Sequence, residues 1–135
     1  MDELYIPRDL VFHYIPKTTI KKYVKVYVCS TNNVLSLEDM DGNLYDYIGV
    51  LYPIPLTPEI LEKNGWDFIG YKMDFSGSMF NIYSKHDILP DLYYYYATKD
   101  FLVSICGKVV LPNMKYVHEL QHLLFGLGLN SEMEV

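Results

Sequence analysis

The segment with the clearest capacity for chemistry is HELQH at residues 118–122, which matches the HExxH pattern. On a helix, histidines four residues apart share one face, so His118 and His122 could hold Zn²⁺ while Glu119 polarises a bound water. A catalytic zinc needs a third protein ligand. The candidates for it are Glu132, Glu134, His13, His86 or an aspartate elsewhere in the chain. The longer form HExxHxxG is not met, because residue 125 is Phe. Zinc hydrolysis is therefore kept as an alternative, and we expect the helix to serve mainly the core.

The second feature is a run of four tyrosines, in a chain with 14 tyrosines, six phenylalanines and one tryptophan. In a strand, Tyr93 and Tyr95 point to one face and Tyr94 and Tyr96 to the other. One pair would then fill the core while the other coats a half-exposed face. Exposed tyrosines are typical of protein interfaces, and they can also stack on a base or a small aromatic ligand. We take Tyr93, Tyr94, Tyr95 and Tyr96 as the candidate binding residues.

Charge and composition narrow the classes of partner. The formal net charge is −6, and an acidic surface repels phosphate backbones, so we expect no duplex nucleic acid as a partner. No stretch approaches the ~20 apolar residues that span a bilayer, and the N-terminus lacks the apolar core of a signal peptide. We expect a cytoplasmic protein without a membrane partner. Cys29 and Cys106 lie in apolar runs, which favours buried free thiols.

The elements that must position these residues are mostly strands. Residues 20–30 alternate apolar and polar side chains with period two, which predicts a strand. The other expected strands of the first part are 10–15, 34–38 and 43–50, with a hairpin turn at Asp41-Gly42. The strand-rich part, 5–50, should form an antiparallel meander that could curl into a small half-open barrel.

Two helices frame a second group of strands. Thr57 as the N-cap and Pro58 as the first helical residue predict a short helix over 58–64, ended by Gly65. The strands expected within 66–111 are 66–75, 79–84, 92–98, 101–106 and 108–111. Leucines at helical spacing predict an amphipathic helix over 113–127 with Asn113 as its cap, and the polar tail should fray. The expected fold is a single α+β domain over 1–135, with antiparallel meanders, a short central helix and a C-terminal amphipathic helix.

Two motifs resemble a family of uncharacterised small proteins of gut bacteria and their bacteriophages. Residues 54–65, IPLTPEILEKNG, are similar to the family's IPLTPEILEKxGF, and residues 116–121, YVHELQ, are similar to the start of its YVHELQNLYFALTG helix. The resemblance covers roughly 53–127. The chain departs from the pattern at His122, where the family has asparagine, and after Leu127. The resemblance implies a bacterial or phage origin and no established activity.

Taken together, these features favour a non-enzymatic binding or interaction module of bacterial or phage origin. It would present its tyrosine-rich sheet face to a protein partner or to a second copy in a homo-oligomer. Two alternatives stay open: a protein that binds a small ligand or nucleotide and acts as a sponge, and the HExxH zinc hydrolase. We expect no cofactor for the module, and zinc only for the hydrolase.

Overall fold

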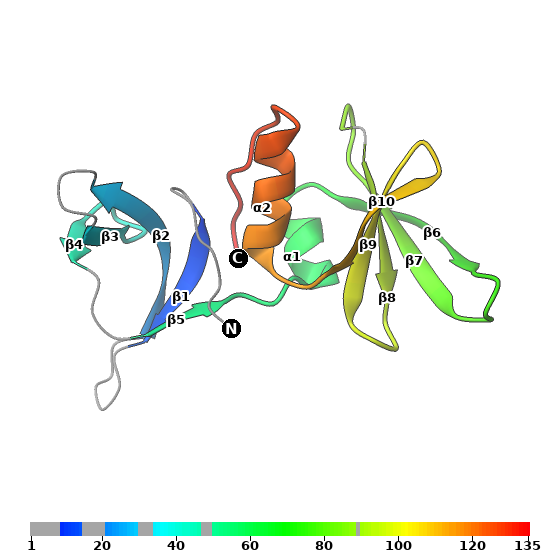
Figure 1. The fold of residues 1–135 in the computed structure, drawn as a ribbon, viewed down its shortest axis with the longest axis horizontal. Coiled ribbons are helices and arrows are strands. Elements are labelled where there is room, and N and C mark those ends of the chain that lie inside the picture. The colour runs from blue at the N-terminus through cyan, green and yellow to red at the C-terminus, as the bar shows by residue number, and fades with distance from the viewer. Residues whose placement is uncertain (1–8, 15–20, 30–33, 47–49, 89) are drawn as a thin grey trace. The chain divides into compact units, whose positions relative to one another are not determined.

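The computed structural model describes residues 9–14, 21–29, 34–46, 50–88 and 90–135. The chain divides into two compact units, Met1–Ile54 and Pro55–Val135, and each is described by itself. The single domain expected over 1–135 stays a prediction. The α+β class is confirmed, because each unit contains a five-stranded antiparallel sheet and the second unit adds two helices (Figure 1).

The first unit is an antiparallel sheet of order β4-β3-β2-β1-β5. Its strands are β1 (Leu10–Tyr14), β2 (Lys21–Cys29), β3 (Val34–Glu38), β4 (Leu44–Asp46) and β5 (Val50–Pro53). The meander β1 to β4 is confirmed. The strand expected over 43–50 is described only in part, because residues 47–49 lie outside the described residues. Its two described ends belong to different strands: β4 pairs with β3, and Val50 begins β5, which pairs with β1. In the described part of the chain the sheet stays open, with β4 and β5 at its two ends, so it is not a closed barrel.

The period-two pattern of β2 produces the core of this unit. Val24 and Val26 are buried with Val11 and Leu37, and Leu51 packs against them. Tyr23, on the opposite face of the strand, is exposed. Because one face of β2 is buried and the other is exposed, its pairing register is fixed: a slip of one residue would expose both valines.

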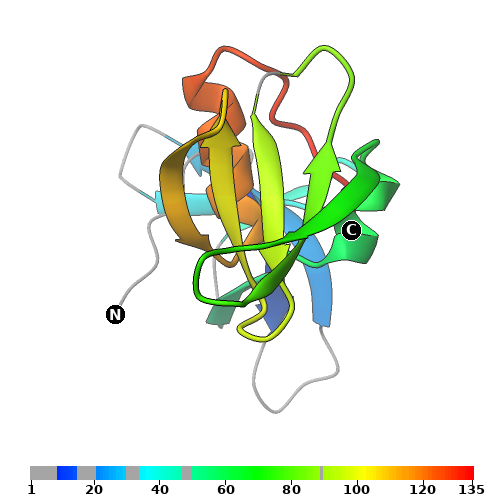
Figure 2. The same ribbon diagram turned by 90° about the vertical axis from the view of Figure 1, so that its right-hand side faces the viewer.

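The second unit is a meander with its strands in chain order, β10-β9-β8-β7-β6. The strands are β6 (Asp67–Met73), β7 (Met79–Ser84), β8 (Asp91–Tyr95), β9 (Asp100–Ile105) and β10 (Lys108–Met114). The helices are α1 (Pro58–Lys63) and α2 (Val117–Gly126). Both helices lie behind the sheet in Figure 2, so they cover one of its faces.

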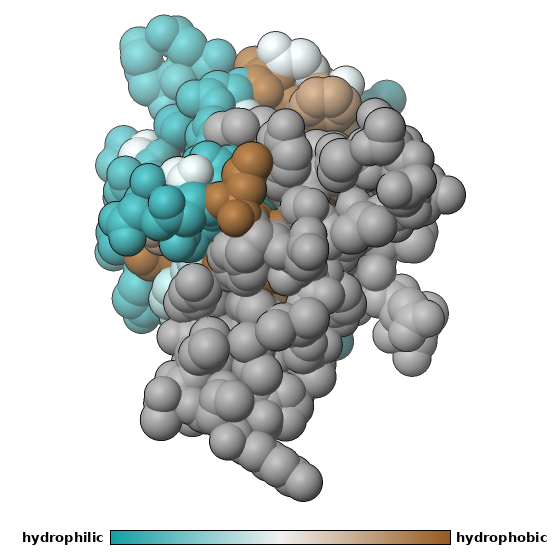
Figure 3. All heavy atoms as spheres, turned by 90° about the vertical axis from the view of Figure 1, so that its left-hand side faces the viewer, coloured by the Kyte–Doolittle hydropathy of each residue, from teal (hydrophilic) through white to brown (hydrophobic). Residues whose placement is uncertain are grey.

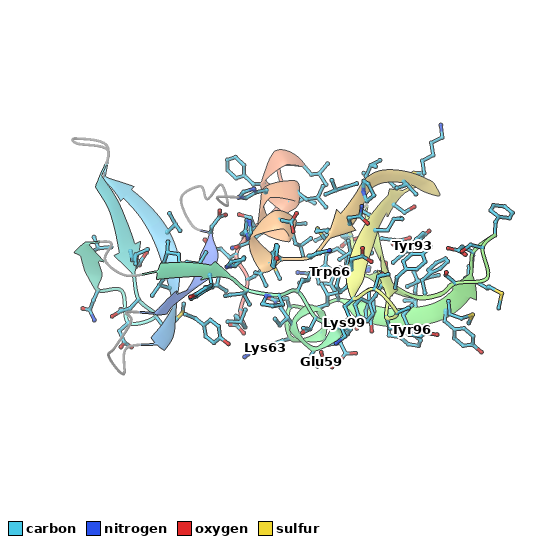
Figure 4. The ribbon with its side chains drawn as sticks, turned by 60° about the horizontal axis from the view of Figure 1, so that its bottom comes forward. Glu59, Lys63, Trp66, Tyr93, Tyr96 and Lys99 are labelled. Atoms are coloured by element: carbon cyan, nitrogen blue, oxygen red, sulfur yellow. The ribbon has the colours of Figure 1, made fainter. Side chains whose placement is uncertain are left out.

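The core of this unit lies between the helices and the covered face of the sheet. Trp66 is 1% exposed, and Leu92, Phe101, Val103 and Leu120 are fully buried. On β9 the buried residues alternate with partly exposed ones from Asp100 to Val103, as expected for a strand with one covered face, and Ser104 is buried as well. In Figure 4 Trp66 lies on the helix side of the sheet and Tyr93 on the other side.

Helix α1 starts and ends where the sequence predicts. The Thr57 side chain accepts a hydrogen bond from the Ile60 amide at 3.3 Å, and Pro58 needs no amide partner at the first helical position. Gly65 takes a left-handed φ of 87°, and the Trp66 amide then donates to the Leu61 carbonyl at 3.0 Å. This closure is the Schellman type that glycine favours.

Two expectations about the C-terminal part were wrong. Asn113 is no helix cap: it lies in β10 with a φ of 59°, and α2 begins only after Tyr116. The tail does not fray, because the Asn64 side chain donates to the Glu134 carbonyl and accepts from the Glu134 amide, both at 2.8 Å. Met133, the residue before Glu134, is buried. The Asn64 side chain thus bonds both main-chain groups of Glu134, as a neighbouring strand would, and holds the tail in place. No local pattern predicts such a contact.

The hairpin turn expected at Asp41-Gly42 is confirmed. Turns also form between the expected strands 66–75 and 79–84 and between 101–106 and 108–111, and the last of these places Cys106 at the surface. Asp41-Gly42 and Ser76-Gly77 lie in turns between β3 and β4 and between β6 and β7. The β9–β10 turn has left-handed φ values at both Cys106 (52°) and Gly107 (80°), as a two-residue hairpin loop requires. Cys106 is therefore exposed, and its expected burial was wrong. The Cys29 side chain lies outside the described residues.

Candidate functional site

The tyrosine run is divided between the two faces of the second sheet. Tyr94 pairs with Phe101 in the β8–β9 register, and their ring centroids are 4.7 Å apart on the helix side. Tyr93 pairs with Leu102, so it lies with Tyr95 on the opposite face. Tyr96 follows the end of β8 and is half-exposed in the turn. The predicted alternation is confirmed for the three tyrosines within the strand.

The face away from the helices carries a stack of three rings. Phe80 of β7 lies between Tyr93 and Tyr95, with centroid distances of 4.8 Å and 5.1 Å and interplanar angles of 31° and 28°. Phe75, at the tip of the β6–β7 hairpin, is fully exposed to solvent. We call Phe75, Phe80, Tyr93 and Tyr95 the aromatic face. Among the described elements, neither helix covers it (Figure 2).

A pocket of about 310 Å³ opens on the aromatic face. Its walls come from the β6–β7 hairpin and from the sheet: Met73, Asp74, Phe75, Phe80, Tyr93, Tyr95, Leu102 and Val109. Figure 2 shows the reason for the hollow, because the β6–β7 hairpin curves in front of the lower part of the sheet. The pocket thus joins residues from five strands and one turn.

Asp74 is the acidic group of this pocket, and it also builds the hairpin. Its Oδ1 atom accepts hydrogen bonds from the Ser76 hydroxyl at 2.6 Å, the Ser76 amide at 2.9 Å and the Ser78 amide at 3.0 Å. These bonds, that from the Ser76 hydroxyl above all, lower the pKa of Asp74 from its ordinary value of 3.8. The carboxylate is therefore charged at neutral pH.

Tyr95 connects the ring stack to that carboxylate. Burial is the main cause that raises the pKa of Tyr95, and its side-chain hydrogen bond with Asp74 raises it further. Asp74 and Asp100 both act on this hydroxyl through their negative charges. The phenol therefore stays protonated and can donate to the carboxylate, which links β8 to the β6–β7 turn.

The sequence reading found the tyrosines of this site but missed Phe75, Phe80 and Asp74. Asp74 and Phe75 were expected within the strand over 66–75, but β6 ends at Met73 and both residues lie in the turn that follows. A large apolar residue at the centre of a tight turn was the one signal available, because turns favour small and polar residues.

The HELQH segment lies on α2, but its acidic residue has a structural role. The Glu119 Oε1 atom accepts hydrogen bonds from the amides of Lys115 and Tyr116, both at 3.0 Å. Glu119 therefore caps the start of the helix as the acidic residue of a capping box does, while its own amide donates to the Tyr116 main-chain carbonyl at 3.1 Å. Its carboxylate thus binds main-chain amides at the position where a hydrolase would need it on a metal-bound water.

The two histidines of the motif are close neighbours. His118 is 2% exposed and His122 is partly buried, and their ring centroids are 5.5 Å apart at an interplanar angle of 75°. Tyr116 stacks on His118 at 5.8 Å. Aromatic contacts on both sides pack the His118 ring into the core of the second unit.

The structure does not bring a third ligand to these histidines within the part of the chain it describes. His86 lies in an exposed turn, 3.2 Å from Asp87, and the main chain of Glu134 pairs with Asn64. The side chain of His13 lies outside the described residues. No group of three or more His, Cys, Asp or Glu side chains suited to a metal ion occurs among the described residues.

Where its residues are described, the face drawn in Figure 3 is mostly hydrophilic, and its apolar side chains form separate spots.

Neither described helix has the length and apolar character needed to cross a membrane. A scan against protein-family models and searches of curated proteins and of solved structures found no match to this chain.

Proposed function

We propose that the second unit is a binding module that contacts a partner protein through its aromatic face. The observation that supports this most is the fully exposed Phe75 beside an apolar pocket. Burying a phenylalanine side chain is worth about 1.5–3 kcal/mol, and folding of this unit leaves that gain unrealised at Phe75, so a partner that covers the ring would obtain it. Aromatic residues are also the type most enriched at interaction hot spots.

The rigidity of the surface strengthens the proposal. Asp74 ties the hairpin tip together with its three hydrogen bonds, and Phe80 of β7 packs against two tyrosines of the neighbouring strand β8. A pre-ordered surface loses little conformational entropy on binding, and this raises affinity. The occupant is a partner protein, and a second copy of the chain is the competing occupant.

A matched pair of variants tests this function. Phe75→Ser removes the exposed ring from the tip of the hairpin, and Phe125→Ser removes an exposed ring from α2. We expect wild-type protein and Phe125→Ser to retain the same protein, identified by mass spectrometry, from extracts of the source cell, and Phe75→Ser to lose it. Equal retention by both variants, or none by the wild type, would contradict the proposal.

Sedimentation of the purified protein separates the two occupants. A monomer at micromolar concentration supports a different partner protein. A dimer that dissociates in Phe75→Ser and persists in Phe125→Ser assigns the aromatic face to a second copy instead.

The pocket itself favours one second candidate, a site for a small ligand. Its volume of about 310 Å³ is at the lower end of the range for ligand sites, and its lining is mostly apolar with one carboxylate. A ligand at 100 times its dissociation constant would stabilise the protein by about 2.7 kcal/mol, which thermal unfolding detects. A panel of nucleotides and small aromatic compounds without a shift would exclude this role.

A further inference from the structure

The pocket of the aromatic face is lined by one charged side chain, and it is a carboxylate. Asp74 is the charged residue among those that line the pocket, and Asp100 pairs with Tyr95 across the β8–β9 ladder. The nearest cation in the sheet register is Lys72, opposite Phe80 on β6, and it is exposed and does not line the pocket. A cationic group would therefore find a carboxylate inside the pocket and an acidic chain of net charge −6 around it.

The rings supply a second attraction for a cation. Phe80, Tyr93 and Tyr95 all line the pocket, and cations bind to aromatic faces by about 0.5–2 kcal/mol. Among protein side chains, the planar guanidinium of arginine both stacks on rings and donates two parallel hydrogen bonds to one carboxylate. Its apolar stem suits the Met73 and Leu102 walls.

We infer that the pocket of the aromatic face takes an arginine side chain from a basic segment of the partner protein. This inference rests on the proposed binding function and specifies the chemistry of the partner. The guanidinium would lie against the rings that line the pocket and pair with Asp74 Oδ2, because Oδ1 already accepts three hydrogen bonds, and Phe75 would cover the peptide backbone.

The test compares arginine with its uncharged analogue. The full chain, labelled with ¹⁵N, is titrated with the peptide acetyl-Gly-Gly-Arg-Gly-Gly-amide and with the same peptide carrying citrulline or lysine. We expect saturable shifts at the amides of residues 74–78 and 93–95 with arginine, and at least tenfold weaker binding with citrulline. Equal binding of citrulline, tighter binding of lysine, or shifts elsewhere would overturn the inference.

The Asp74→Asn variant provides a control that keeps the hairpin. The Asn Oδ1 atom can accept the same bonds from Ser76 and Ser78, but the charge is gone. We expect this variant to bind the arginine peptide at least tenfold more weakly, and Asp87→Asn, which removes an exposed carboxylate from another turn, to bind it like the wild type. Unchanged binding by Asp74→Asn would refute the role of the carboxylate.

The two proposals fail in different ways. If the Phe75-dependent partner is retained but the arginine peptide does not bind, the face is an interface and the arginine assignment is wrong. If neither binds, the binding function itself is wrong.

Discussion

Replacing Glu119 by alanine should lower the free energy of unfolding of the second unit by about 1–2 kcal/mol. The carboxylate accepts hydrogen bonds from two amides at the start of α2, and the loss of such a cap costs about 0.5–2 kcal/mol. The negative charge near the helix N-terminus adds about 0.3–1 kcal/mol. The sum stays modest because Lys115 is exposed, so water can replace one of the two lost acceptors.

Glu119→Gln is the matched control for this substitution. Glutamine keeps an acceptor oxygen within reach of both amides and loses only the charge, so we expect a loss of less than about 1 kcal/mol. If Glu119 were the base of a hydrolase, both variants would lose activity, because neither alanine nor glutamine can act as a base, and the stability of both would stay unchanged.

Urea unfolding followed by tryptophan fluorescence measures this effect. Trp66 is the one tryptophan of the chain and is buried in the second unit, so its emission reports the unfolding of that unit. With a slope of about 2 kcal/mol per molar urea, the alanine variant should unfold at a concentration lower by about 0.5–1 M. A midpoint equal to that of the wild type would refute the capping role, and stabilisation of the wild type by Zn²⁺ would restore the metal hypothesis.

Three further perturbations test other contacts. Because the folded-state pKa of Asp74 is lowered, its contribution to stability is present above 3.8 and disappears as pH falls through the lowered value. Asp74→Asn should therefore show a flatter loss of urea midpoint than the wild type between about pH 5 and about pH 2, and parallel curves would contradict this. Asn64→Ala should lower hydrogen-exchange protection of the Glu134 amide about fivefold, the equivalent of one hydrogen bond of about 1 kcal/mol; undiminished protection would mean that Asn64 does not hold the tail. Cys106→Asn should raise stability by about 0.5–1 kcal/mol, because asparagine tolerates the left-handed φ of this turn, and a lower urea midpoint would argue against that geometry.

Local patterns predicted most of the elements correctly. The strand over 34–38 has the expected limits, and α1 differs from its prediction only by Asn64, because its cap, its proline and its closing glycine all act within one turn. The wrong prediction of the α2 cap has a long-range explanation. Asn113 is a good cap by type, but pairing of Met114 with Phe101 extends β10 past it, and long-range pairing overrides local preference.

The sequence by itself determined most of the strands and helices and that alternate tyrosines of β8 would face opposite ways, since periodicity and caps are local properties. Only the tertiary structure decided which face the helices cover, that Phe80 of β7 would separate Tyr93 from Tyr95, and that Asp74 would reach Tyr95. It also decided that Glu119 caps a helix. These contacts depend on the register and curvature of strands far apart in the chain, which no single segment encodes.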